Sequence, residues 1–118
     1  MDLSEFFEGR EESRQLFEVL FKEMEALGGV KIRVTKSQVA FYRQKTFAWT
    51  WIPSRYLRGK VAQLVLTISL RHHDPSPRWK EIVEPTPGRF THHLELYSTD
   101  DIDDEVRAWM KEALAEAG

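Results

Sequence analysis

Residues 62–71 read AQLVLTISLR, and this stretch decides the fold. Apolar and polar positions alternate along it with a period of two, which is typical of a β-strand that buries one face only. The side chains that we expect to face the core are Leu64, Leu66, Ile68 and Leu70. Those that we expect to face outward are Val65, Thr67, Ser69 and Arg71. The stretch therefore predicts a sheet with one packed face and one open face.

Four further segments read as strands around this one. They are residues 30–35, 38–43, 47–52 and 90–97. In the third segment we expect Phe47, Trp49 and Trp51 to share a face, with Trp49 in the core. In the last segment His92 falls on the apolar side and His93 on the polar side. We expect a buried His92 whose ring nitrogens bond to a backbone group or a carboxylate, and a His93 on the open face.

Helices flank the predicted strands at both ends of the chain. Apolar residues at three- and four-residue spacing predict an N-terminal helix that is capped by Ser4 or Ser13 and stopped by Gly28. A C-terminal helix follows the aspartates at 100–104, with Asp100 or Asp101 as its cap and Trp109 in the core. The element order predicts one α+β domain over residues 1–118. It is a two-layer sandwich of five antiparallel strands, with the N- and C-terminal helices on one face.

The connection between the last two predicted strands is long and rich in proline. It spans residues 72–89, and a loop of this length usually carries structure or a function of its own. Ser76 followed by Pro77 favours a short helix over residues 76–83, because proline fits the first position of a helix. Trp79 lies between Arg78 and Lys80, and we expect it to be exposed or at the rim of the core.

Composition excludes several classes of function. The chain has no cysteine, so thiolate catalysis, disulfides and cysteine-ligated metals are excluded. No apolar run is long enough to span a bilayer, and the acidic start does not resemble a signal peptide. We therefore expect a cytoplasmic protein that has no membrane partner.

Charge is distributed unevenly although the net charge is only −2. Residues 1–30 and 90–118 are acidic, whereas residues 31–89 hold twelve basic and three acidic residues. The simpler interpretation is that the helices hold acidic residues for structural reasons alone. The functional interpretation is a basic sheet face that binds phosphates or another polyanion, nucleic acid included. The residues that we expect to bind such a ligand are Lys36, Arg71, Arg78, Trp79, Lys80 and His93.

Histidine and aspartate near the two central strands raise a second hypothesis. His72, His73 and Asp74 leave one strand where His93 lies on the next, and these residue types are ligands for zinc and similar metals. The alternative function is therefore a metal-dependent hydrolase built from these four residues. Neighbouring residues of a strand point to opposite faces, so each histidine pair offers one ring to each side. We expect no cofactor on balance, with a divalent metal as the alternative.

Family resemblance supports the fold more than the function. The residues Thr35-Lys36-Ser37, Ser76-Pro77-Arg78, Glu84-Pro85 and His92-His93, together with the Asp-rich last helix, resemble a bacterial family catalogued as domain of unknown function fifty-six fifty-five. That resemblance implies no catalytic residues. The element order is also distantly similar to the YjbR-like (MmcQ-like) family, which implies a fold similar to frataxin-type domains and to a double-wing nucleic-acid binder.

These observations together predict a small binding module rather than an enzyme, with an anionic partner on the basic sheet face. The metal-dependent hydrolase is one alternative. A protein-interaction or dimerisation module that uses a strand edge is another.

Overall fold

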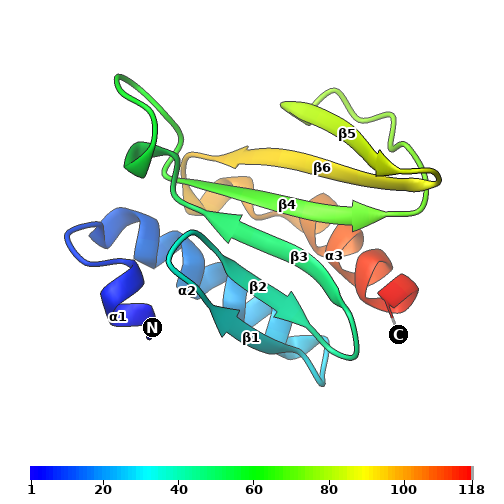
Figure 1. Cartoon of the computed structure of the whole chain (residues 1–118), viewed down its shortest axis with the longest axis horizontal. Coiled ribbons are helices and arrows are strands. Elements are labelled where there is room, and N and C mark those ends of the chain that lie inside the picture. The colour runs from blue at the N-terminus through cyan, green and yellow to red at the C-terminus, as the bar shows by residue number, and fades with distance from the viewer. Residues whose placement is uncertain (118) are drawn as a thin grey trace.

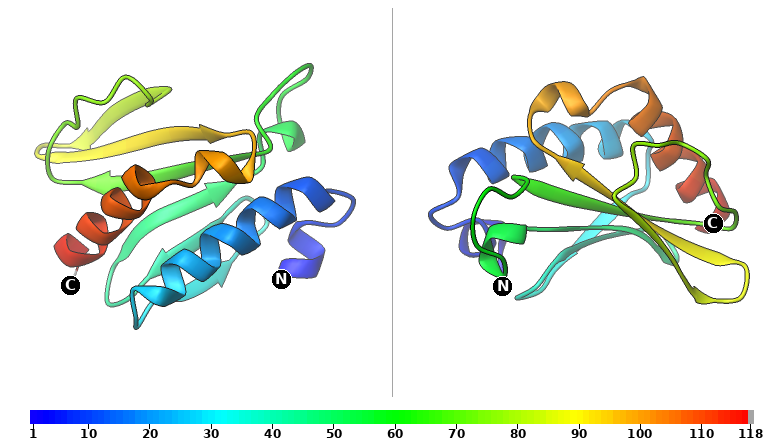
Figure 2. Two further views of the ribbon diagram at one scale, coloured as in Figure 1. Left: turned by 180° about the vertical axis from the view of Figure 1, so that it is seen from behind. Right: turned by 90° about the horizontal axis from the view of Figure 1, so that it is seen from above.

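The computed structural model describes residues 1–117 and arranges them in two layers (Figure 1). An antiparallel sheet forms one layer, with strand order β1-β2-β3-β4-β6-β5. Two helices form the other layer, and both lie on the same face of the sheet (Figure 2). These two helices are α2 (Glu11–Ala26) and α3 (Asp104–Ala117), and the short helix α1 (Leu3–Phe6) precedes α2. The strands are β1 (Lys31–Val34), β2 (Val39–Tyr42), β3 (Thr46–Trp51), β4 (Leu64–Leu70), β5 (Glu81–Thr86) and β6 (Arg89–Leu96).

The α+β class and the one-sided packing predicted from residues 62–71 are confirmed. The inward set of β4 is at most 1% exposed and packs beneath α2 and α3. Between α2 and β2 the core is aromatic, and Phe17 of α2 stacks on Phe41 of β2 with ring centroids 5.9 Å apart. Burial of large apolar side chains between the two layers is the main stabilising contribution. None of the helices in residues 1–117 has the length and apolarity that a membrane crossing would need.

The sheet has six strands, so the prediction of five was wrong. The segment predicted as a helix over residues 76–83 is instead a loop followed by β5, which pairs with β6. Pro87 and Gly88 form the two-residue turn of this hairpin, and Gly88 has a φ of +79° that suits a tight turn. Ile82 packs against the core while most of β5 is exposed. Pairing with β6, rather than a strong local pattern, therefore specifies this strand.

A bulge in β3 changes the predicted face of its aromatic residues. Phe41 pairs with Ala48 but Tyr42 pairs with Thr46, so Phe47 is an extra residue in β3. The bulge places Phe47 in the core, whereas Trp49 and Trp51 lie on the opposite face and are half-buried. The predictions that the three share a face and that Trp49 belongs to the core were therefore wrong.

The helix caps also differ from the expected residues. Asp2 caps α1 by accepting a hydrogen bond from the Glu5 N–H, while Ser13 is buried inside α2. Asp103 caps α3, because its Oδ1 accepts from the Val106 N–H at 3.1 Å. Asp101 instead accepts from the backbone N–H groups of Tyr97 and Ser98. The position of Asp103 matters below, because the same carboxylate also binds Arg78.

Candidate functional site

The face of the sheet that points away from α2 and α3 is uncovered, and we call it the open face. Figure 1 views the molecule from this side, with the helices behind the sheet. Its central side chains come from β3, β4 and β6 and are Trp49, Trp51, Thr67, Thr91 and His93. Two half-buried tryptophans on an uncovered face are unusual, because large aromatic side chains normally complete a core or an interface. The open face is therefore the first candidate for a binding surface.

Two adjoining hollows cross the open face, and both include Trp51 and His93. One extends toward Thr91, and the other toward Leu57 and Lys80. A third, smaller hollow lies where β4 ends and β3 and β6 begin, and its polar lining includes Lys45, Ser69, Arg71, Arg89 and Glu116. Phe47 of the core and Ala113 and Ala117 of α3 also line it, so the third hollow extends round the end of the sheet toward the helices. Ser69 pairs directly with Thr91, so the third hollow lies beside the hollow that extends toward Thr91. We call the three together the groove.

His93 lies at the centre of the groove, on the open face as predicted. Its Nδ1 is 2.8 Å from the Thr67 hydroxyl on the neighbouring strand. Partial burial lowers the pKa of His93, and the negative charge of Glu81 opposes this effect only in part. At neutral pH the ring is therefore uncharged, so it offers a hydrogen bond and a flat surface rather than a positive charge.

His92 is fully buried beneath the helices, and both of its ring nitrogens have backbone partners. Nδ1 is 3.1 Å from the Phe90 carbonyl, to which it donates, and Nε2 accepts from the Asp74 N–H at 3.1 Å. This arrangement requires the neutral tautomer with its proton on Nδ1. The prediction of a buried histidine bonded to backbone is confirmed, and His92 therefore serves the architecture.

The three histidines with perturbed pKa values predict a characteristic pH dependence. Desolvation lowers the pKa of His92 below its usual 6.5, so the unfolded chain takes up a proton there while the native chain does not. The free energy of unfolding should therefore fall as pH decreases below 6.5, and His93 contributes with the same sign. His72 has the opposite sign: its hydrogen bond to Glu112 raises its pKa, and that stabilisation is lost as pH rises through the raised value.

NMR titration of the imidazole signals tests these directions. His92 and His93 should titrate below 6.5 and His72 above it, with substitution of each histidine by glutamine used for assignment. A His92 signal that titrates above 6.5 would contradict the desolvated, neutral ring.

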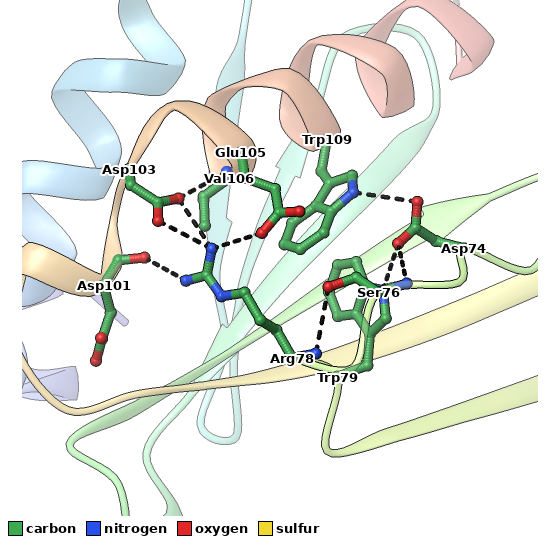
Figure 3. Close-up of polar contacts among 9 residues, drawn as sticks. All are labelled: Asp74, Ser76, Arg78, Trp79, Asp101, Asp103, Glu105, Val106 and Trp109. Carbon is green, nitrogen blue, oxygen red and sulfur yellow. Dashed lines mark hydrogen bonds and ion pairs between the residues drawn. The ribbon is translucent and has the colours of Figure 1, made fainter.

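Asp74 is the centre of a polar cluster that fastens the β4–β5 connection to α3 (Figure 3). Its Oδ2 accepts hydrogen bonds from the Ser76 N–H at 3.0 Å and from Trp79 Nε1 at 2.9 Å, and its Oδ1 accepts from Trp109 Nε1 at 3.3 Å. Burial alone would raise the pKa of Asp74, but the hydrogen bonds from Trp79 and Ser76 outweigh it and lower the pKa. The two indole rings pack with centroids 4.1 Å apart.

This cluster corrects the prediction for Trp79. Its side chain is only 9% exposed and also contacts the His92 ring, at a centroid distance of 4.8 Å. Charged neighbours at 78 and 80 suggested exposure, but the connection folds back over the first turns of α3. Trp79 therefore belongs to the core and is not available to stack on a ligand.

Arg78 is likewise occupied within the protein. One guanidinium nitrogen donates to both oxygens of Asp103 at 3.0 Å and to Glu105 at 2.9 Å, and the other donates to the Asp101 carbonyl at 3.0 Å (Figure 3). Two carboxylates thus neutralise a single guanidinium at the N-terminal end of α3. Such a network binds the connection to the helix rather than presenting a charge to a ligand.

The structure brings together three of the six predicted ligand-binding residues. His93, Lys80 and Arg71 all line the groove, with Lys80 Nζ 3.7 Å from Glu95. Lys36 lies instead in the turn between β1 and β2, and Arg78 and Trp79 lie beside α3. The predicted set therefore does not form one site.

Two basic residues of the groove, Lys45 and Arg89, were not among the predicted ligand-binding residues. Each stands at a strand start, next to a turn. Their only sequence signal was a positive charge at the same end of the sheet as Arg71. That signal becomes specific only when the strand order is known.

The four predicted metal ligands are also separated. His72 Nε2 bonds to Glu112, His73 lies edge-on to Phe90, Asp74 accepts from two indoles, and His93 contacts Thr67. In the described part of the chain, the three-residue group with metal-ligand geometry is His72, Glu112 and Glu116. Sequence reasoning missed both glutamates, although their spacing of four places them on one face of a helix.

Comparison with known proteins gives one match. A family model described as "Domain of unknown function (DUF5655)" matches residues 3–115. No curated protein matches the chain, and no solved structure matches it either. The match covers nearly the whole fold, including the open face and the Asp74 cluster.

Proposed function

The chain belongs to the DUF5655 family, and from this premise we propose that it is a binding module whose groove takes single-stranded nucleic acid. The observation that carries the proposal is the order of side chains along the groove. Half-buried Trp49 and Trp51 occupy its middle, Lys80 lines one end, and Lys45, Arg71 and Arg89 line the other. Proteins that bind single strands combine stacking aromatics with cations that follow the phosphates in this way.

Geometry favours a short, flexible and flat ligand. Val65 and Ser69 mark the two ends of the groove on β4, and a strand rise of about 3.3 Å per residue puts them roughly 13 Å apart. The aromatic side chains stand on strands rather than loops, so the surface needs little ordering on binding. Neutral His93 and Thr67 add hydrogen-bonding groups level with Trp49 across the sheet, and the Thr91 hydroxyl adds one nearer the basic end.

Charge supports an anionic ligand at the end of the groove but not along its whole length. Among residues 1–117, the third hollow is lined by three basic side chains and by the carboxylate of Glu116. Arg71 also donates from its guanidinium to the Glu116 main-chain carbonyl at 2.8 Å, which fixes its position. Within residues 1–117 its other guanidinium N–H groups have no partner. Glu81 and Glu95 at the other end restrict the strongest phosphate contacts to the hollow of Lys45, Arg71 and Arg89. A cytoplasmic location and a distant relation to the YjbR-like family remain part of this hypothesis.

The salt dependence of binding tests the proposal. Fluorescence anisotropy of a labelled single-stranded oligonucleotide, measured with a chelator present, should show affinity that falls as salt rises. Each phosphate neutralised on a single strand contributes a slope of about −0.7 in log K against log salt. Lys45→Gln and Arg89→Gln should each reduce the slope by about that amount.

A matched control comes from the other side of the molecule. Lys111 is an exposed lysine on α3 that lines none of the three hollows, so Lys111→Gln removes the same charge outside the groove and should leave the slope unchanged. Absent binding, salt-independent binding, or an equal loss in Lys111→Gln would refute the groove as the site. Self-association through the tryptophans, measured as mass in solution, would point to a protein partner instead.

A further inference from the structure

His72, Glu112 and Glu116 form a cluster beside the groove, which it meets at Glu116. His72 lies two residues after the end of β4, and the two glutamates lie one turn apart in the second half of α3. One ligand atom from each residue lies within 4.8 Å of the other two, and His72 Nε2 is 2.7 Å from Glu112 Oε2. One nitrogen and two carboxylates from two separate elements thus converge on one point.

The distances suit a small divalent cation. Zinc bonds of 2.0–2.2 Å to nitrogen and oxygen put tetrahedral ligand atoms roughly 3.4 Å apart. His72 Nε2 and Glu112 Oε2, now 2.7 Å apart, need to separate slightly around such an ion. The widest separation in the cluster is within 4.8 Å, so it needs to close by at most about 1.4 Å. Glutamate side chains have the rotamer freedom for this movement, and all three residues are exposed or half-buried, so no core contact is lost.

Two hydrogen bonds from Arg71 fix the position of Glu116. The Arg71 N–H donates to Glu116 Oε1 at 2.9 Å, while the Arg71 guanidinium donates to the Glu116 main-chain carbonyl. The Arg71 guanidinium therefore does not form an ion pair with the Glu116 carboxylate. The Arg71 backbone N–H orients that carboxylate toward His72. Hydrogen bonds of this kind to a ligating carboxylate are a regular feature of metal sites.

We propose that His72, Glu112 and Glu116 bind a divalent transition metal ion, with zinc as the best fit. Imidazole together with carboxylates favours zinc and its neighbours over magnesium, which prefers oxygen ligands only. A neutral imidazole and two carboxylates carry a charge of −2, which balances the ion. The ion links the end of β4 to the last turns of α3, and the three protein ligands leave a coordination position for water.

Zinc titration of the full-length, tag-free protein tests the site. After treatment with a chelator, isothermal titration calorimetry with zinc chloride should give one ion per chain, and zinc should raise the melting temperature. His72→Ala and Glu112→Gln should each weaken binding at least about tenfold, because the loss of a ligand costs more than the loss of a supporting hydrogen bond. Cobalt should bind at the same place, with a visible absorption spectrum that reports the ligand geometry.

His73→Ala is the matched control, because it removes an adjacent, exposed histidine that is outside the cluster. It should keep wild-type affinity and stoichiometry. The proposal is overturned if the wild-type chain binds no zinc, if His72→Ala binds as tightly as wild type, or if His73→Ala loses as much as His72→Ala. Circular dichroism of each variant separates loss of the site from loss of the fold. Because the oligonucleotide titration includes a chelator, the two proposals fail independently.

Discussion

Replacing Asp74 with alanine is expected to lower the free energy of unfolding by about 3 kcal/mol, because it leaves buried indole N–H groups without acceptors. Asp74 accepts from Trp79, Trp109 and the backbone of Ser76. The tryptophans are 9% and 5% exposed, so water reaches their N–H groups poorly once the carboxylate is gone. Urea unfolding followed by tryptophan fluorescence measures the loss directly.

Two further variants identify the cause of that loss. Asp74→Asn keeps one acceptor oxygen but turns an N–H₂ group toward a donor, so its effect should be intermediate. Asp100→Ala removes an exposed carboxylate from the turn before α3 and should change the free energy of unfolding by less than about 0.5 kcal/mol. If Asp74→Ala is as mild as Asp100→Ala, the cluster does not fasten the connection to the helix.

The second large effect is expected on ligand affinity. Trp49→Ala and Trp51→Ala should each weaken binding of a single-stranded oligonucleotide by about ten- to a hundredfold, since stacking of one base on an aromatic ring contributes about 1–3 kcal/mol. Trp51 should have the larger effect, because it lines two of the hollows in the groove. Trp51→Phe keeps a stacking surface and should restore most of the affinity.

Tyr97 provides the control for these variants. It is 58% exposed and lines a separate hollow beside α2, although its hydroxyl reaches Glu95 at the rim of the groove. Tyr97→Ala therefore removes an accessible aromatic ring that lines none of the three hollows of the groove. The affinity of Tyr97→Ala should equal that of wild type, and thermal melting should confirm that every variant is folded. Equal affinity in the tryptophan variants and wild type would remove stacking from the proposed function.

Sequence patterns predicted the parts of the fold that have strong local signals. The alternation in residues 62–71 and the apolar spacing in α2 and α3 were sufficient for the α+β class and for helices on one face. The strand β5 was missed because Ser76 followed by Pro77 is a pattern typical of a helix start. In addition, apolar and polar residues do not alternate clearly along Glu81–Thr86. Its conformation depends on β6, a partner that a local pattern does not reveal.

The candidate site was predicted less completely, for reasons that the bulge in β3 illustrates. One extra residue at Phe47 reverses which aromatic side chains face outward, and no feature of the sequence marks its position. Trp79 was predicted to be exposed because its two neighbours in the sequence are charged, but its side chain is buried. His92 and His93 were assigned to the correct faces, since the strand that carries them is regular.

The two strands at the edges of the sheet have a bearing on solubility. Edge strands present unpaired backbone groups that can recruit a strand from another molecule and begin aggregation. Here one edge, β1, is only four residues long and carries Lys31 and Arg33. The other edge, β5, contains Pro85, which has no N–H to donate, and its register with β6 is irregular between Val83 and Thr86. Both edges therefore discourage edge-to-edge pairing of strands, even though two half-buried tryptophans lie on the neighbouring open face.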